Sequence, residues 1–207
     1  LDDPLANAAA TAERSLLNAL RAGCRAPVAA FATPAEGRTL ILRARVLALL
    51  VALGGLALCV SVFFAVWAGV LGGRGGLRRS PALVASAERG VVAVFALLSL
   101  AMIGLEAALL GDRFDLAFVA SISTREQPWL FKVALWGGQA GSLLLWTWML
   151  GLMGFLAVAQ NRRRNRTLMP WVIAVMMLNV VFFAALCSFV SNPFEALPPG
   201  SAWSSGQ

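Results

Sequence analysis

The residues best suited to hold a ligand gather in one stretch that combines aromatic rings with small side chains, namely Trp136, Gly137, Gly138, Gln139, Gly141, Ser142 and Trp146. Small residues spaced four apart let another helix or a flat ligand approach a helix backbone closely. The first and last tryptophans are ten residues apart, about 15 Å along a helix axis, so they can line one wall but cannot clamp a single ring. Helix packing with interfacial tryptophans explains the same spacing, so both interpretations stay open here.

Charged and thiol groups add few further candidates. Glu106 interrupts an apolar run, and we predict that it either pairs with Lys132 or Arg113 or reaches the membrane interface unaided. Lys132 heads another apolar run, where it could attract an anionic ligand or serve as an interfacial anchor. The chain contains no histidine, which excludes imidazole ligation of haem or zinc and a Ser-His triad within it. The three cysteines form no CxxC, so they predict neither a disulfide framework nor a metal site.

The composition is that of a membrane protein. Of 207 residues, 59% are apolar and 13% are charged, whereas soluble domains carry about 25% charged residues. The net charge of +7 comes mostly from arginine, which by itself would suit a nucleic-acid binder. The arginines lie in short clusters between apolar runs, as cytoplasmic loops do. We therefore expect the lipid bilayer, and not nucleic acid, as the partner.

Four apolar runs are each long enough to cross a membrane, since about 20 helical residues span roughly 30 Å of hydrocarbon. They are also longer than the apolar core of a signal peptide. The sequence predicts an all-α polytopic membrane protein with four transmembrane helices, preceded by a short partial α+β segment. The predicted helices cover residues 46–73, 91–110, 133–159 and 168–190.

The arginine clusters predict the orientation of these helices. Segments 74–89 and 160–166 hold four arginines each and one acid between them. The excess of cations in cytoplasmic loops places both segments inside the cell. The loop 111–132 and the tail 191–207 then face outward, and the stretch that begins at Trp136 lies at the same outer face.

Two outward segments have patterns of their own. Bulky residues alternate in FDLAFVA at 114–120, which predicts an extended segment laid on a surface, either as the shelter of a ligand or as a plain connector. The last apolar run is followed by Asn192, Pro193, Phe194 and Glu195. A helix stop accounts for the asparagine and the proline, but it requires neither Phe194 nor Glu195.

Four motifs resemble, in order and spacing, the N-terminal part of the CcmF family. They are FDLAFVA at 114–120, PxxFK at 128–132, WGGQxGSLLLW at 136–146 and SNPFE at 191–195. The resemblance covers about residues 47–200. CcmF is the polytopic haem lyase subunit of cytochrome c maturation, so the resemblance implies a multi-pass chain of the bacterial inner membrane that helps deliver haem to apocytochrome c at the outer, periplasmic face. It also implies a haem chaperone and other maturation subunits as partners.

The chain departs from this family in two respects. Ala140 stands where the family motif usually carries an acid, and the chain holds neither the family's tryptophan-rich segment nor its haem-ligating histidines. The resemblance therefore implies a scaffold for a haem site completed elsewhere, and not a chain that is catalytic alone.

Residues 1–45 resemble a different family. Helical spacing around Leu16, the segment GCRAPVAAF at 23–31 and alternation over 38–45 predict helix, loop, strand, turn and strand. This pattern is similar to the third, C-terminal domain of porphobilinogen deaminase (hydroxymethylbilane synthase). The resemblance implies that Cys24 matches the cysteine that carries the dipyrromethane cofactor. About half of that domain is present, so we expect no deaminase activity.

The two segments conflict, because a deaminase domain is cytosolic whereas the loop charges place the N-terminus outside. Arg43 and Arg45, directly before the first span, add to the conflict. We interpret the chain as a truncated or joined reading frame from neighbouring haem-pathway genes. Two alternatives remain: a fragment of a tetrapyrrole-synthesis enzyme, based on residues 1–45, and a small membrane transporter component, based on Glu106 and the glycine-rich helix faces.

Overall fold

The structure is a computed structural model that describes residues 39–124, 127–132 and 137–197. Residues 1–38, which include Cys24 and most of the deaminase-like segment, lie outside the described residues. Trp136 also lies outside them.

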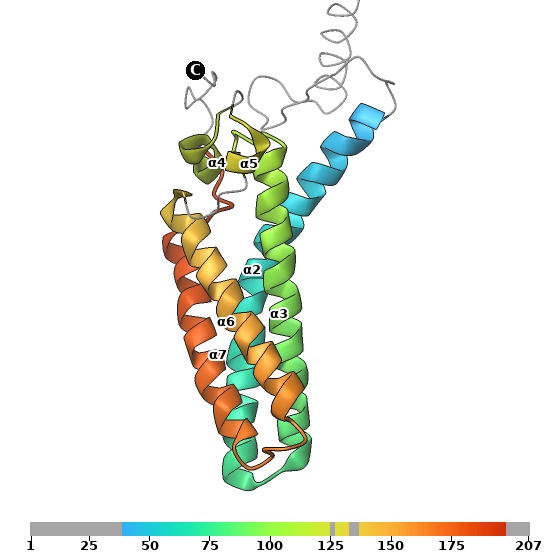
Figure 1. The fold of residues 1–207 in the computed structure, drawn as a ribbon, viewed down its shortest axis with the longest axis vertical. Coiled ribbons are helices and arrows are strands. Elements are labelled where there is room, and N and C mark those ends of the chain that lie inside the picture. The colour runs from blue at the N-terminus through green and yellow to red at the C-terminus, as the bar shows by residue number, and fades with distance from the viewer. Residues whose placement is uncertain (1–38, 125–126, 133–136, 198–207) are drawn as a thin grey trace, which may run out of the picture.

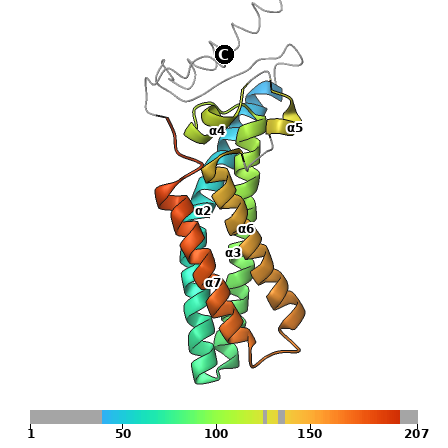
Figure 2. The same ribbon diagram turned by 60° about the vertical axis from the view of Figure 1, so that its left-hand side comes forward.

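Four long helices run side by side and form a bundle (Figures 1 and 2). They are α2 (Thr39–Arg78), α3 (Pro81–Leu110), α6 (Gln139–Asn161) and α7 (Met169–Ala185), which the π-helix η2 (Leu186–Val190) continues. Four helical segments are long and apolar enough to cross a membrane, which confirms the predicted all-α polytopic fold. Two short helices, α4 (Ala117–Ile122) and α5 (Trp129–Lys132), lie at one end of the bundle (Figure 1).

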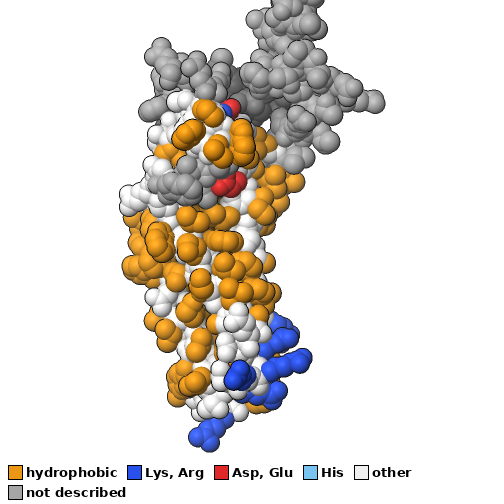
Figure 3. Space-filling view, viewed as in Figure 1, with side chains coloured by type: hydrophobic (Ala, Val, Ile, Leu, Met, Phe, Trp, Pro, Cys, Tyr) orange, Lys and Arg blue, Asp and Glu red, His pale blue; other side chains and the backbone are white. Residues whose placement is uncertain are grey.

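The helices contact one another in a ring. α2 packs on α3 and on α7, and α6 packs on the other sides of the same two helices. Apolar side chains also cover the outside of the bundle, where Phe63, Leu178 and Phe189 are each more than two-thirds exposed. Figure 3 shows this apolar surface along the bundle and the arginines gathered at one end. An apolar exterior is what a helix bundle presents to lipid.

Glycines allow the closest helix contact. A Cβ on Gly104 of α3 would lie 2.7 Å from the carbonyl oxygen of Leu50 and 2.9 Å from Cα of Gly54, both on α2. Glycine at these positions therefore brings the two backbones into direct contact, as small residues do between membrane helices. Close packing on glycine thus occurs at the α2–α3 contact, which the sequence analysis did not single out.

Three helix ends differ from the ends of the predicted spans. α2 continues to Arg78 and α3 begins at Pro81, so most of the predicted loop 74–89 is helical. α6 begins at Gln139 and not at residue 133, because the preceding Gly138 is extended, with φ −144° and ψ 161°. Hydropathy locates the apolar core of a helix, whereas proline and glycine set where the backbone starts or stops.

Both predicted extended segments were also largely wrong. The strand expected over 38–45 is helical from Thr39, because it runs without a break into the long apolar α2. In the segment 114–120, extended backbone is limited to the region of Leu116, which forms an isolated antiparallel bridge with Ala196, and α4 begins at Ala117. Alternation over so few residues does not separate a strand from a buried helical turn.

We predict that Gly104→Ala destabilises the bundle by about 1–3 kcal/mol, because the added methyl group meets backbone atoms that cannot rotate away. Gly73→Ala is the matched control, since nothing lies within 4 Å of a Cβ there. Thermal unfolding in detergent, followed by circular dichroism, measures both. Equal midpoints for the two variants would show that the α2–α3 contact is looser than described.

Candidate functional site

One end of the bundle carries a cap made from residues 111–124, 127–132 and 191–197, here called the platform. Figure 1 shows α4 and α5 in this cap, at the end opposite the α2–α3 and α6–α7 turns. The arginine clusters of residues 74–79 and 162–166 lie at those turns (Figure 3). The platform therefore contains the segments that the sequence analysis predicts to face outward, separated from the arginines by the length of the bundle.

Backbone hydrogen bonds join the tail to the loop after α3. The amide of Ala117 donates to the carbonyl of Glu195 at 2.9 Å, and the amide of Leu197 donates to the carbonyl of Asp115 at 2.8 Å. These bonds flank the bridge between Leu116 and Ala196. Two motifs nearly 80 residues apart in the sequence, FDLAFVA and SNPFE, are thereby paired directly.

The tail is also anchored by Phe194. The Asn192 side-chain oxygen accepts a hydrogen bond from the Phe194 amide at 2.9 Å, which forms a turn after η2. The Phe194 ring lies against α2, where a Cβ on Gly54 would be 3.0 Å from the ring carbon Cζ. Pro193 is buried and the Glu195 side chain is exposed. Phe194 therefore has a packing role that a helix stop does not explain, whereas Glu195 contributes through its backbone.

Two ion pairs fix the loop of the platform. Arg113 donates to both carboxylate oxygens of Asp115, at 2.7 and 2.6 Å. The Lys132 ammonium donates to Asp112, and the Lys132 side chain is only 8% exposed. A bidentate pair and a pair with a buried ammonium hold their segments more firmly than ordinary surface pairs do.

These pairs overturn the predicted partners of Glu106. Both Lys132 and Arg113 are paired with aspartates of the loop, and one carboxylate oxygen of Glu106 is buried with no hydrogen-bond partner among the described residues. Lys132 is likewise not free to attract an anionic ligand. Asp112 was missed by the sequence analysis, because only the fold brings it to a lysine 20 residues away.

The stretch after Trp136 bends at the start of α6 instead of continuing one helix. A Cβ on Gly138 would lie 2.8 Å from the Phe118 ring and 3.1 Å from the side chain of Ile122, so α4 packs directly on this glycine. Gly137 is open, with nothing within 4 Å of a Cβ. Gly137 and Gly138 thus precede α6, so they do not lie on one helix with Gly141 and Ser142.

The other residues of the stretch lie on the first turn of α6. Gln139 is exposed, Gly141 is buried and Ser142 is partly buried, and the Ser142 amide donates to the carbonyl of Gly138 at 3.0 Å. Gly138 thus starts the helix, and Gly141 is among its buried positions.

The tryptophans of α6 point in different directions. Trp146 is 58% exposed. Trp148 points toward α3, where its indole nitrogen donates to the Ser99 hydroxyl at 3.0 Å and its ring packs near Phe95. The sequence analysis gave Trp148 no role, although a spacing of two on a helix does place neighbouring tryptophans on different faces.

The described residues contain no group of three His, Cys, Asp or Glu side chains placed to hold a metal ion. Because the whole chain also lacks histidine, it offers no imidazole to haem iron. What the platform does offer is an apolar surface on α5, where Trp129, Leu130 and Phe131 are each more than 60% exposed. The arrangement suits contact with a flat apolar body or a protein partner.

Comparisons with known proteins point to one family for the membrane region. The chain is 35% identical over 145 residues to the cytochrome c-type biogenesis protein CcmF of Pseudomonas fluorescens, covering 70% of this chain and 21% of that protein. It is 37% identical over 125 residues to the probable cytochrome c-type biogenesis protein NrfE of Escherichia coli, covering 58% and 22%. A solved structure of cytochrome c haem lyase CcmF superposes with a TM-score of 0.66 at 28% identity, covering 75% of this chain and 26% of that one.

The front of the chain matches a second family. The family model of the porphobilinogen deaminase C-terminal domain matches residues 7–50, which overlap α2 from Thr39 onward. The chain spans about a fifth of the length of the CcmF and NrfE relatives.

We predict that Phe194→Ala loosens the platform, with a loss of about 1–3 kcal/mol because the ring is only partly buried. Hydrogen exchange of the amides at 115–117 and 191–197 should then be faster. Glu195→Ala is the neighbouring control, since its exposed side chain has no part in the backbone pairing, and exchange should be unchanged. Equal exchange in the two variants would contradict the anchoring role of Phe194.

Proposed function

We propose that this chain, a homologue of the CcmF and NrfE cytochrome c-type biogenesis proteins, acts in cytochrome c maturation as a membrane scaffold for haem delivery to apocytochrome c. In this role haem is the cargo, and the chain orients and shields it without ligating its iron. Imidazole ligation of the haem iron would come from residues outside this chain, since it has no histidine.

The observation that carries this proposal is the convergence of the four motifs at the platform. FDLAFVA and SNPFE are joined by the hydrogen bond from the Ala117 amide to the Glu195 carbonyl, beside the Leu116–Ala196 bridge. The PxxFK lysine is tied to the same loop through Asp112, and Gly138 of the WGG motif packs under α4. Because these segments lie next to one another, they can form one surface that binds a ligand or a partner. A scaffold that presents haem would use such a surface beside the membrane.

The exposed face of α5 supports a contact role. Trp129 and Phe131 present apolar rings from a helix whose Lys132 is held by Asp112, so the helix that carries the rings is already in place before a partner binds. Aromatic side chains are enriched at protein contacts and can stack on flat ligands. The haem chaperone, another maturation subunit or apocytochrome c would meet the chain at this face.

We also propose that the platform faces the periplasm and that the arginine end faces the cytoplasm of a bacterial inner membrane. The support is the excess of arginine at the α2–α3 and α6–α7 turns. In the same proposal, residues 1–45 are a separate deaminase-like segment without catalytic activity of its own, and Cys24 binds no dipyrromethane in this chain.

We predict that an impermeant thiol reagent labels Gln139→Cys but not Thr167→Cys in intact cells, after the native cysteines have been replaced. Both positions are exposed and uncharged. Gln139 begins α6 at the platform end of the bundle, and Thr167 lies in the α6–α7 turn at the arginine end. Labelling of both after lysis is the control for reactivity. The reverse pattern would overturn the orientation and, with it, the periplasmic role.

The role in maturation is tested in a bacterium whose own CcmF carries residues 47–197 of this chain in place of its corresponding segment. We predict that c-type cytochromes, measured by haem staining of gels, are still made. Trp129→Gln with Phe131→Gln should lower the yield several-fold, because the platform loses its aromatic contacts.

Leu168→Gln, a similarly exposed apolar position at the arginine end, is the control and should leave the yield unchanged. Membrane levels of each chimera, measured by immunoblot, separate loss of function from loss of protein. Normal yield from the platform variant at normal protein level would contradict the proposed role.

A further inference from the structure

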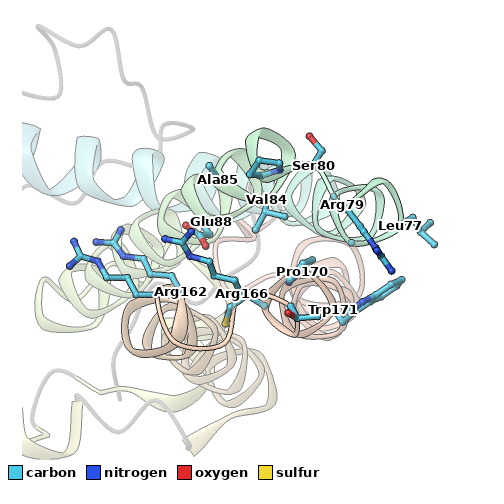
Figure 4. A pocket seen from close by; sticks show the side chains of 16 residues that line it. Leu77, Arg79, Ser80, Val84, Ala85, Glu88, Arg162, Arg166, Pro170 and Trp171 are labelled. Atoms are coloured by element: carbon cyan, nitrogen blue, oxygen red, sulfur yellow. The ribbon is translucent and has the colours of Figure 1, made fainter.

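A hollow lies at the arginine end of the bundle, opposite the platform. It is an open groove of about 1240 Å³ between the α2–α3 turn and the α6–α7 turn (Figure 4). The charged residues that line it are Arg79, Arg162, Arg163, Arg166 and Glu88. With four arginines against one acid, the groove carries a net charge of +3.

The arginines of the groove are not neutralised by the described residues. Among the described residues there are two ion pairs, Arg113–Asp115 and Lys132–Asp112, and both belong to the platform. Glu88 lines the groove without an ion pair to any of the four arginines. The guanidinium groups are therefore available to an anion, and a guanidinium binds phosphate oxygens through paired hydrogen bonds.

Two helix starts add to the positive potential. α3 begins at Pro81 and α7 at Met169, and both residues line the groove. Ser80, which precedes α3, makes no side-chain hydrogen bond to the first turn. Since the N-terminal end of a helix carries partial positive charge, both helices favour an anion at the position that the arginines surround.

The groove also has an apolar side. The Trp171 ring lies against α2, where a Cβ on Gly76 would be 3.0 Å from it, and the ring is still 46% exposed. Leu77 lines the same groove and is 74% exposed. A ligand with one anionic end and one apolar end matches both sides, whereas a free anion leaves the apolar side unused.

We propose that this groove binds an anionic phospholipid, with the phosphate held by the arginines and the acyl chains lying along Trp171 and Leu77. Glu88 would accept a hydrogen bond from a headgroup hydroxyl such as that of phosphatidylglycerol. This site is separate from the platform and does not depend on the proposed function.

The groove differs from a general excess of positive charge at a cytoplasmic face. Arg74, Arg78 and Arg164 lie in the same two turn regions but do not line it. A diffuse attraction would use all the arginines of this end alike, whereas a built site uses only those that surround the hollow.

The test uses the full chain purified in detergent and measures bound lipid by native mass spectrometry with phosphatidylglycerol, with phosphatidylcholine and with inorganic phosphate as a competitor. We expect retention of phosphatidylglycerol over phosphatidylcholine. R162Q/R163Q/R166Q should weaken phosphatidylglycerol binding by about 100-fold, from roughly fivefold for each arginine. The control R74Q/R78Q/R164Q removes the same charge outside the groove and should change binding little.

Equal losses in the two triple variants, or equal retention of the two lipids, would overturn the proposal in favour of diffuse attraction. Displacement of the lipid by inorganic phosphate at equal concentration would identify a site for free phosphate instead. Trp171→Ala should weaken lipid binding several-fold. Unchanged binding in this variant would contradict the proposed contact between the acyl chains and Trp171. Circular dichroism verifies that each variant is folded. If the triple variant does not fold, Arg166→Gln alone replaces it in the test, with an expected fivefold loss of phosphatidylglycerol binding.

Discussion

The contact between α2 and α3 at Gly54 and Gly104 is the constraint on which the arrangement of this protein depends. Between helices in lipid there is no gain from withdrawing apolar surface from water, so association relies on close packing and on hydrogen bonds. Here the two backbones meet within van der Waals distance. Phe194 then packs on Gly54 and Gly55, which couples the tail of the chain to the same contact.

This coupling explains why the platform forms where it does. The tail that follows η2 can pair with the loop at Leu116 only because Phe194 fixes its course across α2. The loop is in turn held by the pairs of Asp112 and Asp115, which lie at the end of the bundle and not within it. The ion-paired side chains of the platform thus lie outside the apolar core, which suits a chain in a membrane.

The two ends of the bundle are chemically opposite. At the platform the cations Arg113 and Lys132 are paired with aspartates, and apolar rings are exposed on α5. At the other end, the arginines that line the groove are unpaired among the described residues, and two helices begin beside them. The platform, whose cations are paired, suits contact with an apolar body or a partner protein. The arginine end, whose groove arginines are unpaired, suits binding of a phosphate group.

The sequence alone determined the four spans, the location of both arginine clusters and the motifs that resemble CcmF, because hydropathy and short motifs are properties of contiguous residues. Only the tertiary structure decided that Lys132 pairs with Asp112, that Gly138 packs under α4 and that Trp148 bonds to Ser99. It also decided the ends of the helices, which hydropathy placed up to ten residues away. The physical reason is that a residue's partner depends on which segments the backbone brings together, and that depends on glycine contacts and helix ends that carry no hydropathy signal.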